Sequence, residues 1–302
     1  MLKYHPHIIN IILTSRIWKN LPLLFIFLSG LVVGNTNFNF FVVTIALVGI
    51  AFSSVFMTHL NIITDKNLDL IEKPHLYKML SSNKSIMKGA LILEIAITIA
   101  CISLLVLLKY YFSALFILIF TMVTILYSYN FFSNYPEKNR FKVYWYGHFF
   151  VLICGYLSLW YTGFYSGYNA VNFYIWLPVF LSISLSEYGL FLFESAVDKK
   201  SEKQANLKTL AALLGKKNST LMAIFFSIVG FIILILSYSL INSSKILIYC
   251  FLPSSILILF FLTVVSIKRL YLKVETFKVP DIIFNIGRLY ILFSIIYIKF
   301  IA

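Results

Sequence analysis

Long apolar runs separated by short polar breaks dominate this sequence of 302 residues. A helix needs about 20 consecutive apolar residues to cross the hydrocarbon core of a bilayer, and most of the runs reach that length. A transmembrane β-barrel would instead show alternating apolar and polar positions in segments of about ten residues. We therefore predict an all-α polytopic membrane protein with nine spans, near residues 18–35, 38–60, 86–108, 110–129, 144–164, 171–193, 219–241, 246–267 and 281–301.

The first of these spans is short, because its uninterrupted apolar stretch runs only from Leu21 to Gly34. Gly30 and Gly34 lie four residues apart in it, a spacing that permits close approach of a second helix but that also arises incidentally. The third and fourth spans follow each other so closely that the chain must turn near Lys109. Arg16 lies beside the first span and no small-residue cleavage site follows it, which indicates a retained segment rather than a signal peptide.

Composition agrees with a chain that lies in lipid. Hydrophobic residues make up 61% of it, charged residues only 12%, and the mean hydropathy is +0.91. Because a soluble domain carries about 25% charged residues, soluble enzyme folds are excluded. The three cysteines lie singly inside apolar runs without CxxC spacing, which indicates neither a disulfide framework nor a thiolate metal site. We treat residues 1–302 as one transmembrane domain.

The net charge of +14 comes from basic clusters in the breaks between the apolar runs. A nucleic-acid partner is not expected, because its binding would need basic residues along one polar face. Cytoplasmic loops of membrane proteins concentrate Lys and Arg, and most of the 25 basic residues fall at the N-terminus and after the second, fourth, sixth and eighth spans. We therefore predict a cytoplasmic N-terminus, a C-terminus on the opposite side and, in a bacterium, the inner membrane.

Acidic residues are few, and they gather at the expected cytoplasmic ends of the second and sixth spans. In each group the oxygen-bearing residues recur at i, i+4 and i+8, which places them along one face of a helix. Neighbouring carboxylates on a helix repel each other, and oxygen ligands of this kind suit Mg²⁺. Two such stripes at the same membrane face favour one shared metal-bound ligand. The stripes are Asn61, Asp65 and Asp69, and Glu194, Asp198 and Glu202.

Other interpretations of the acidic residues stay open. A single acid at the end of a span is most often a solvated helix terminus, and interleaved residues such as Lys66 and Lys199 can neutralise it. Three further charged residues, Glu94, Glu187 and Arg288, fall within spans, where a charge is a functional candidate. A structural ion pair is the alternative for them. Glu187 lies two turns deeper than the second stripe, on nearly the same face.

With these residues in view, the chain resembles the UbiA-type intramembrane prenyltransferase family. The first motif of that family is Asn-Asp-x-x-Asp-x-x-x-Asp followed by a basic residue and Pro; the first stripe matches it, with Lys73-Pro74 after it. Ile62 stands at the second motif position, where the family has Asp. Tyr127-Ser128 and Arg140-x-Lys142 are similar to the Tyr-Ser and basic segment that follow the fourth span of the family.

The second stripe resembles the second family motif, Asp-x-x-x-Asp-x-x-x-Gly-x-x-Thr-Leu ending in Leu-Gly. Thr209-Leu210 and Leu214-Gly215 match its last part, whereas Glu202 replaces Asp and Asn206 replaces Gly. Nine helices are also the span count of the family. The resemblance therefore implies nine transmembrane helices in a bundle around a central cavity that opens near the cytoplasmic face.

The resemblance implies a transferase of alkyl or aryl groups other than methyl. It would move a prenyl group, with Mg²⁺, from a polyprenyl diphosphate to an aromatic or other electron-rich lipophilic acceptor in the membrane. The metal ligands would be Asn61, Asp65, Asp69, Glu194, Asp198 and Glu202. The catalytic residues would be Asp65, Asp69, Asp198 and Glu202, with Glu187 as the base. The diphosphate contacts would be Lys73, Arg140, Lys142 and Lys208.

Three alternatives remain at this point. A UbiA-related terpenoid cyclase would use the same motifs on one substrate. A carrier would line a path with Glu94, Glu187 and Arg288. A non-catalytic partner subunit is suggested by Ile62, which removes one carboxylate from the first motif.

Overall fold

The computed structural model of the protein describes residues 17–34, 39–64, 84–129, 141–167, 173–196, 208–238, 246–273 and 279–300. In these residues the structure has nine long α-helices and no strand, which confirms the all-α prediction. The helices are α2 (Ile17–Gly34), α3 (Phe40–Thr64), α6 (Lys84–Leu107), α7 (Tyr111–Ser128), α8 (Trp145–Gly167), α9 (Phe173–Ser195), α11 (Leu210–Ser237), α13 (Leu252–Ile267) and α14 (Val279–Phe300).

Each predicted span coincides with one long helix. Seven of the described helices are long and apolar enough to cross a membrane. The other two, α2 and α14, carry shorter apolar stretches, Pro22–Gly34 and Ile282–Ile298. The prediction of a polytopic membrane protein is thereby confirmed, whereas the count of nine transmembrane spans stays a prediction for these two helices.

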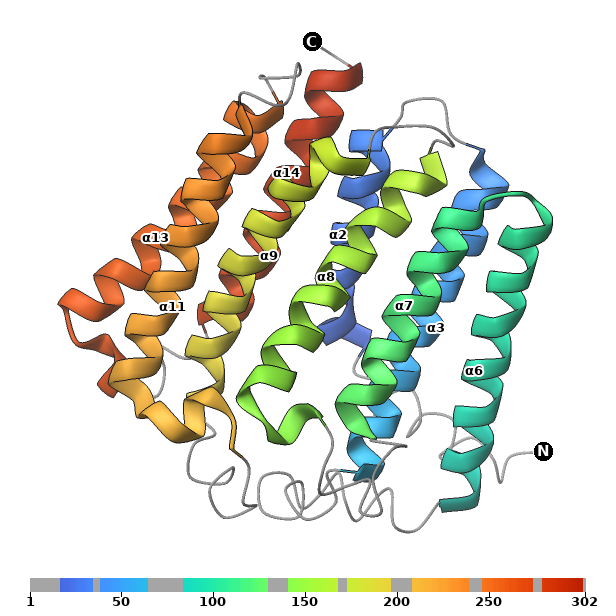
Figure 1. The fold of residues 1–302 in the computed structure, drawn as a ribbon, viewed down its shortest axis with the longest axis horizontal. Helices are drawn as coiled ribbons and strands as arrows, with labels where there is room; N and C mark the ends of the chain where they lie inside the picture. Colours follow the sequence, from blue (N-terminus) through green and yellow to red (C-terminus); the bar gives the residue numbers. More distant parts are fainter. Residues whose placement is uncertain are drawn as a thin grey trace, which may run out of the picture.

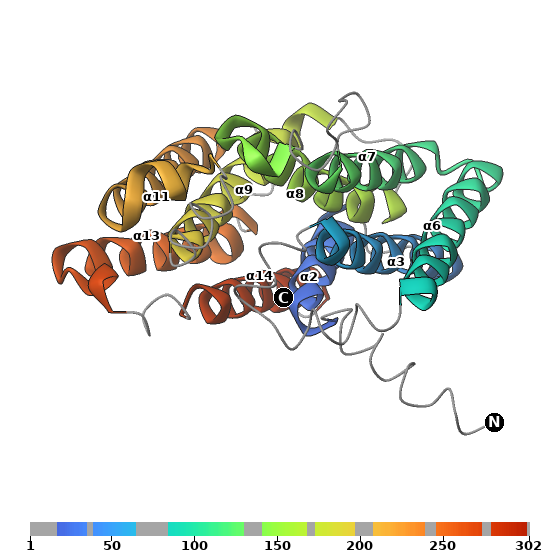
Figure 2. The ribbon, with the colours of Figure 1, turned by 90° about the horizontal axis from the view of Figure 1, so that it is seen from below.

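Successive helices run in opposite directions, as Figure 1 shows. The C-terminal ends of α3, α7 and α9 lie at the same end of the bundle as the N-terminal ends of α6, α8 and α11. We call this the motif end, because the two acidic stripes begin there. Seen from that end, the helices form an elongated ring, with α2 and α14 side by side on one long edge (Figure 2).

The helical state follows from the apolar sequence, because a backbone in lipid must satisfy its polar groups internally. Polar side chains inside the bundle follow the same rule. On α8, Ser158, Thr162 and Ser166 each donate a hydrogen bond to the carbonyl four residues earlier, at 2.6, 2.7 and 2.7 Å. A hydroxyl therefore stays buried in α8 without needing a partner on another helix.

The outward faces of the bundle are apolar. Large side chains such as Ile92 on α6, Phe225 on α11 and Phe260 on α13 are more than half exposed. Contiguous apolar surface on this scale is unusual for a soluble monomer. It is the surface expected of an integral membrane protein.

The turn between α6 and α7 lies where the sequence predicts it, whereas the start of α11 does not. The turn near Lys109 is confirmed, with φ of 67° at Lys109 between α6 and α7. The seventh span begins at Leu210 in the structure, not near residue 219, because Thr209 caps this helix with a hydrogen bond from the Ala212 amide. Gly215, with φ of 77°, kinks α11, so the predicted start near residue 219 lies close to the start of its second and longer segment.

Glycines allow α2 and α8 to pack at very short range. A Cβ on Gly30, Gly34 or Gly163 would collide with backbone atoms of the opposite helix, such as the carbonyl oxygens of Trp160 and Phe27. The close approach suggested by the spacing of Gly30 and Gly34 is therefore present, and Gly163 on α8 completes it from the other side.

Gly163→Ala tests this crossing. The new Cβ would meet the Phe27 carbonyl, and overpacking of this kind costs about 1–3 kcal/mol. We expect a clearly lower unfolding temperature in detergent, measured by scanning fluorimetry. The matched control is Gly89→Ala on α6, where a Cβ meets nothing within 4 Å. An equal loss in both variants would contradict the packing argument.

Candidate functional site

The candidate site lies at the motif end, where residues from several helices meet. Asn61 belongs to the last turn of α3, and Tyr127 and Ser128 end α7. The helix η2 (Phe141–Val143) leads into α8 and carries Lys142. Some helices end in this region and others begin there, so residues that are far apart in the sequence lie near each other.

The ends of α3 and α7 are joined by a short hydrogen bond. The Ser128 hydroxyl donates to Asn61 Oδ1 at 2.6 Å, and Ser128 is fully buried. A carboxamide oxygen has two lone pairs, so this bond orients Asn61 and leaves one lone pair for another ligand.

The ends of α7 and α8 are joined by an aromatic pair. Tyr127 Oη and His148 Nε2 lie 3.1 Å apart, and the two rings stack with their centroids 5.5 Å apart. The Lys142 ammonium lies 5.7 Å from the Tyr127 ring centroid. The predicted cation therefore lies beside the Tyr-Ser pair.

His148 carries the contacts on to α9. Its ring centroid lies 4.9 Å from that of Phe191 and 6.4 Å from that of Tyr188, both on α9. We call Asn61, Ser128, Tyr127 and His148 the polar bridge. Through it, a continuous set of contacts runs from α3, which carries the start of the first acidic stripe, to α9, which carries the start of the second.

A backbone contact fixes the segments before α8 and α11 next to each other. The Lys208 amide donates to the Val143 carbonyl at 2.8 Å, and Tyr144 and Lys208 form a parallel β-bridge. Lys142 and Lys208, two of the four predicted diphosphate contacts, therefore lie on adjacent backbone segments. Lys208 is exposed and Lys142 is half-buried.

The last part of the second motif shapes the start of α11. The Thr209 hydroxyl accepts a hydrogen bond from the Ala212 amide at 3.1 Å, which makes it the helix cap. Gly215 has φ of 77° and ψ of 173°, a conformation that L side chains rarely adopt, and it breaks the helix there. These motif residues have a structural role in the described chain.

The UbiA prenyltransferase family model matches residues 23–278, which is most of the chain. The chain belongs to the UbiA prenyltransferase family. A comparison with curated proteins gives no match.

Solved UbiA-family structures share this fold. A UbiA homologue from Archaeoglobus fulgidus bound to GPP and Mg²⁺ has 15% identity and a TM-score of 0.72, covering 95% of this chain and 99% of its own. A digeranylgeranylglyceryl phosphate synthase has 20% identity and a TM-score of 0.69, over 96% and 98% of the two chains. The apo UbiA homologue from Aeropyrum pernix K1 has 16% identity and a TM-score of 0.66, over 90% and 96%.

Most of the UbiA motif side chains lie outside the described residues. Asp65 directly follows Thr64, the last residue of α3, and Asp198 comes shortly after Ser195, the last residue of α9. Ile62 is described and buried, at 5% exposure, so its side chain packs inside the protein. The predicted site residues outside the described part are Asp65, Asp69, Lys73, Arg140, Asp198 and Glu202.

The two described members of the acidic stripes fit a magnesium ion. Asn61 offers an oriented carboxamide oxygen, and Glu194 offers a half-buried carboxylate near the end of α9. Both are the hard oxygen donors that Mg²⁺ prefers. In the described part of the chain, no group of three His, Cys, Asp or Glu side chains could hold a metal ion. That part of the chain lacks four of the six predicted ligands.

The charged residues within the spans are paired. Arg288 Nε donates to Glu187 Oε1 at 2.7 Å, and the guanidinium lies 4.8 Å from the Phe284 ring centroid and 5.7 Å from that of Tyr156. Glu187 Oε2 has no hydrogen-bond partner among the described residues. Arg288 and Glu187 therefore form a structural ion pair, which was the alternative considered for charged residues within the spans.

Glu94 also has a partner on another helix, His59 of α3. His59 Nδ1 and Glu94 Oε1 lie 2.7 Å apart, and both residues are buried. Residue spacing does not reveal this partner, because the two residues are 35 positions apart in the chain and lie on different helices. His148 was missed as a site residue for the same reason, since only its contacts with Tyr127 and Phe191 reveal its place.

Removal of one partner tests the Glu187 and Arg288 pair. Arg288→Leu leaves an uncompensated carboxylate inside the bundle, and breaking a buried pair in this way costs about 3–5 kcal/mol. We expect a large drop in unfolding temperature in detergent. The double variant Glu187→Leu/Arg288→Leu should recover most of that loss, because neither charge remains. Equal stability of the two variants would speak against a coupled pair.

Proposed function

We propose that this protein is a Mg²⁺-dependent prenyltransferase of the membrane. It transfers a prenyl group from a polyprenyl diphosphate to an aromatic or other electron-rich lipophilic acceptor. Membership of the UbiA family supports the chemistry, and so do the relatives bound to GPP or DMAPP with Mg²⁺. The acceptor class is our own inference from the family resemblance.

The observation that carries the proposal is the polar bridge. It connects the end of α3, which precedes Asp65, with α9, which carries Glu194. A diphosphate needs positive charge and metal ligands on both sides of it. Contacts that hold the two helix ends together support a single site formed by both stripes.

In this site the oxygen ligands of the two stripes hold the metal: Asn61, Asp65 and Asp69 from one side, and Glu194, Asp198 and Glu202 from the other. When bound, Mg²⁺ supplies charge stabilisation for the departing diphosphate. Lys73, Arg140, Lys142 and Lys208 bind the diphosphate oxygens. Arg140 suits a forked contact and the lysines act as point charges.

Aromatic side chains at the motif end exclude water from the reacting carbon. Tyr188 on α9 is fully buried, and its ring lies edge-on to Phe149 and Phe226, with centroids 5.0 Å away in both cases. Such faces also stabilise an allylic cation by cation–π attraction. The tail of the donor then lies among the apolar spans.

Glu187 is the proposed base for the proton that the acceptor releases. Its Oε1 is bound by Arg288, whereas Oε2 is the atom without a described partner. Oε2 is therefore the position at which a proton is taken. Arg288 keeps the side chain in place while Oε2 reacts.

The carrier alternative has less support than the transferase, because the family model that matches this chain is that of a prenyltransferase family.

Replacement of one acid in each stripe tests the metal site. We expect Asp65→Ala and Asp198→Ala to abolish Mg²⁺-dependent release of diphosphate from a panel of prenyl diphosphates. Folding should be preserved, because both positions follow the last turns of their helices, and size-exclusion chromatography checks this. Turnover at the wild-type rate in either variant would remove that residue from the site.

Replacement of single lysines tests the diphosphate contacts. A hydrogen bond to a charged group contributes about 1.5–3 kcal/mol, so Lys142→Gln and Lys208→Gln should raise the KM for the donor about tenfold or more. Lys109→Gln is the matched control, since Lys109 lies in the turn before Tyr111, at the end of α7 opposite to Tyr127 and Ser128. An unchanged KM in both site variants would contradict the assignment.

A further inference from the structure

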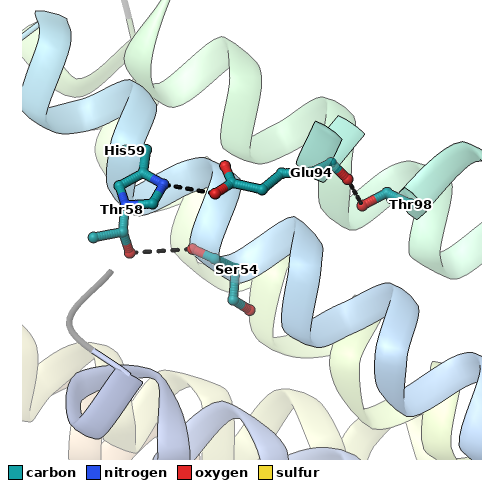
Figure 3. Close-up of polar contacts among 5 residues, drawn as sticks. All are labelled: Ser54, Thr58, His59, Glu94 and Thr98. Carbon is teal, nitrogen blue, oxygen red and sulfur yellow. Dashed lines mark hydrogen bonds and ion pairs between the residues drawn. The ribbon is translucent and has the colours of Figure 1, made fainter. Parts of the chain in front are cut away.

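The last turn of α3 is held by hydrogen bonds on two of its sides. On one side Asn61 Oδ1 accepts from Ser128 of α7 at 2.6 Å. On another side His59 Nδ1 lies 2.7 Å from Glu94 Oε1 of α6, as Figure 3 shows. Residues two apart on a helix point about 200° away from each other. The two contacts therefore act on nearly opposite faces of α3.

The His59 contact is fully enclosed. His59 is 0% exposed and Glu94 is 5% exposed. One turn further along α6, the Thr98 hydroxyl donates to the Glu94 carbonyl at 2.9 Å (Figure 3). The rest of α6 offers α3 mostly apolar side chains, and a hydrogen bond between side chains adds a directional constraint to that packing.

We propose that Glu94 and His59 are positioning residues for the metal site. Together with Ser128 they set the rotation of the last turn of α3, and so the direction in which Asn61 points. This inference rests on the proposed function, because it concerns the metal ligands of that site.

A metal ion accepts only small displacements of its ligands, so the rotation of α3 about its axis affects the metal site. The Cα atoms of a helix lie about 2.3 Å from its axis, so a rotation of about 10° moves each of them by about 0.4 Å. Metal–ligand distances hold to within about 0.2 Å, and Mg²⁺ demands near-ideal octahedral geometry. A small rotation is therefore enough to misplace Asn61.

A stability role alone does not account for this pair. Replacement of both partners of a buried polar pair by apolar side chains of similar volume is often neutral or stabilising. The rotation of α3 is a property that an apolar pair cannot define so sharply. The first motif is also short of one carboxylate, at the buried Ile62, so the remaining ligands have less room for misplacement.

The test measures metal binding directly. Mn²⁺ is titrated into the purified full chain in detergent with inorganic diphosphate, and the bound ion is counted by electron paramagnetic resonance. We expect His59→Leu/Glu94→Leu to keep or raise the unfolding temperature and to weaken Mn²⁺ binding about tenfold or more, as outer-sphere changes commonly do. Ser113→Ala, which removes a buried contact with Ser166 of 3.2 Å at the other end of the bundle, should bind Mn²⁺ as the wild type does.

Two single variants keep the test decisive if the double variant does not fold. Glu94→Met removes the acceptor and should also weaken binding, whereas Glu94→Gln keeps an acceptor oxygen and should restore it. Wild-type Mn²⁺ affinity in Glu94→Met, or equal weakening in Glu94→Gln and Glu94→Met, would overturn the inference. A wild-type chain that binds Mn²⁺ but releases no diphosphate from any donor would contradict the proposed function alone, because the comparison of Mn²⁺ affinities does not depend on turnover.

Discussion

The structure depends on one constraint: a polar group placed in lipid must find its partner inside the protein. The backbone meets it by forming helices, and the hydroxyls of α8 meet it on their own helix. The buried ionisable side chains meet it across helices, in the pairs Glu187 with Arg288 and Glu94 with His59. Each cross-helix pair therefore connects two helices at a defined register, as the close glycine packing of α2 against α8 also does.

The same constraint explains why the sequence predicted the helices so well. Hydropathy measures which segments can lie in lipid, so each predicted span coincides with one helix of the structure. It failed at the start of α11, where Thr209 caps a first turn and Gly215 breaks it before the apolar run begins. Capping and a positive φ are local backbone features, and average hydropathy does not contain them.

The site was predictable only in part. Asn61 and Glu194 came from a spacing of four residues on one helix, which is a local signal. Their surroundings are not local: Ser128 meets Asn61 from α7, and His148 meets Tyr127 from α8. Such partners depend on how the helices pack against each other, and the periodicity of the sequence does not reveal that packing. The resemblance to the UbiA motifs predicted the order of the motif residues along the chain, but it predicted none of these contacts.

The bridge between Tyr144 and Lys208 has a consequence for biosynthesis. It closes a ring of chain that contains all of α8 and α9, and a ribosome delivers the amino-terminal part of that ring first. A nascent chain that stops before Lys208 therefore contains both helices but lacks the backbone contact that holds the segments before α8 and α11 together.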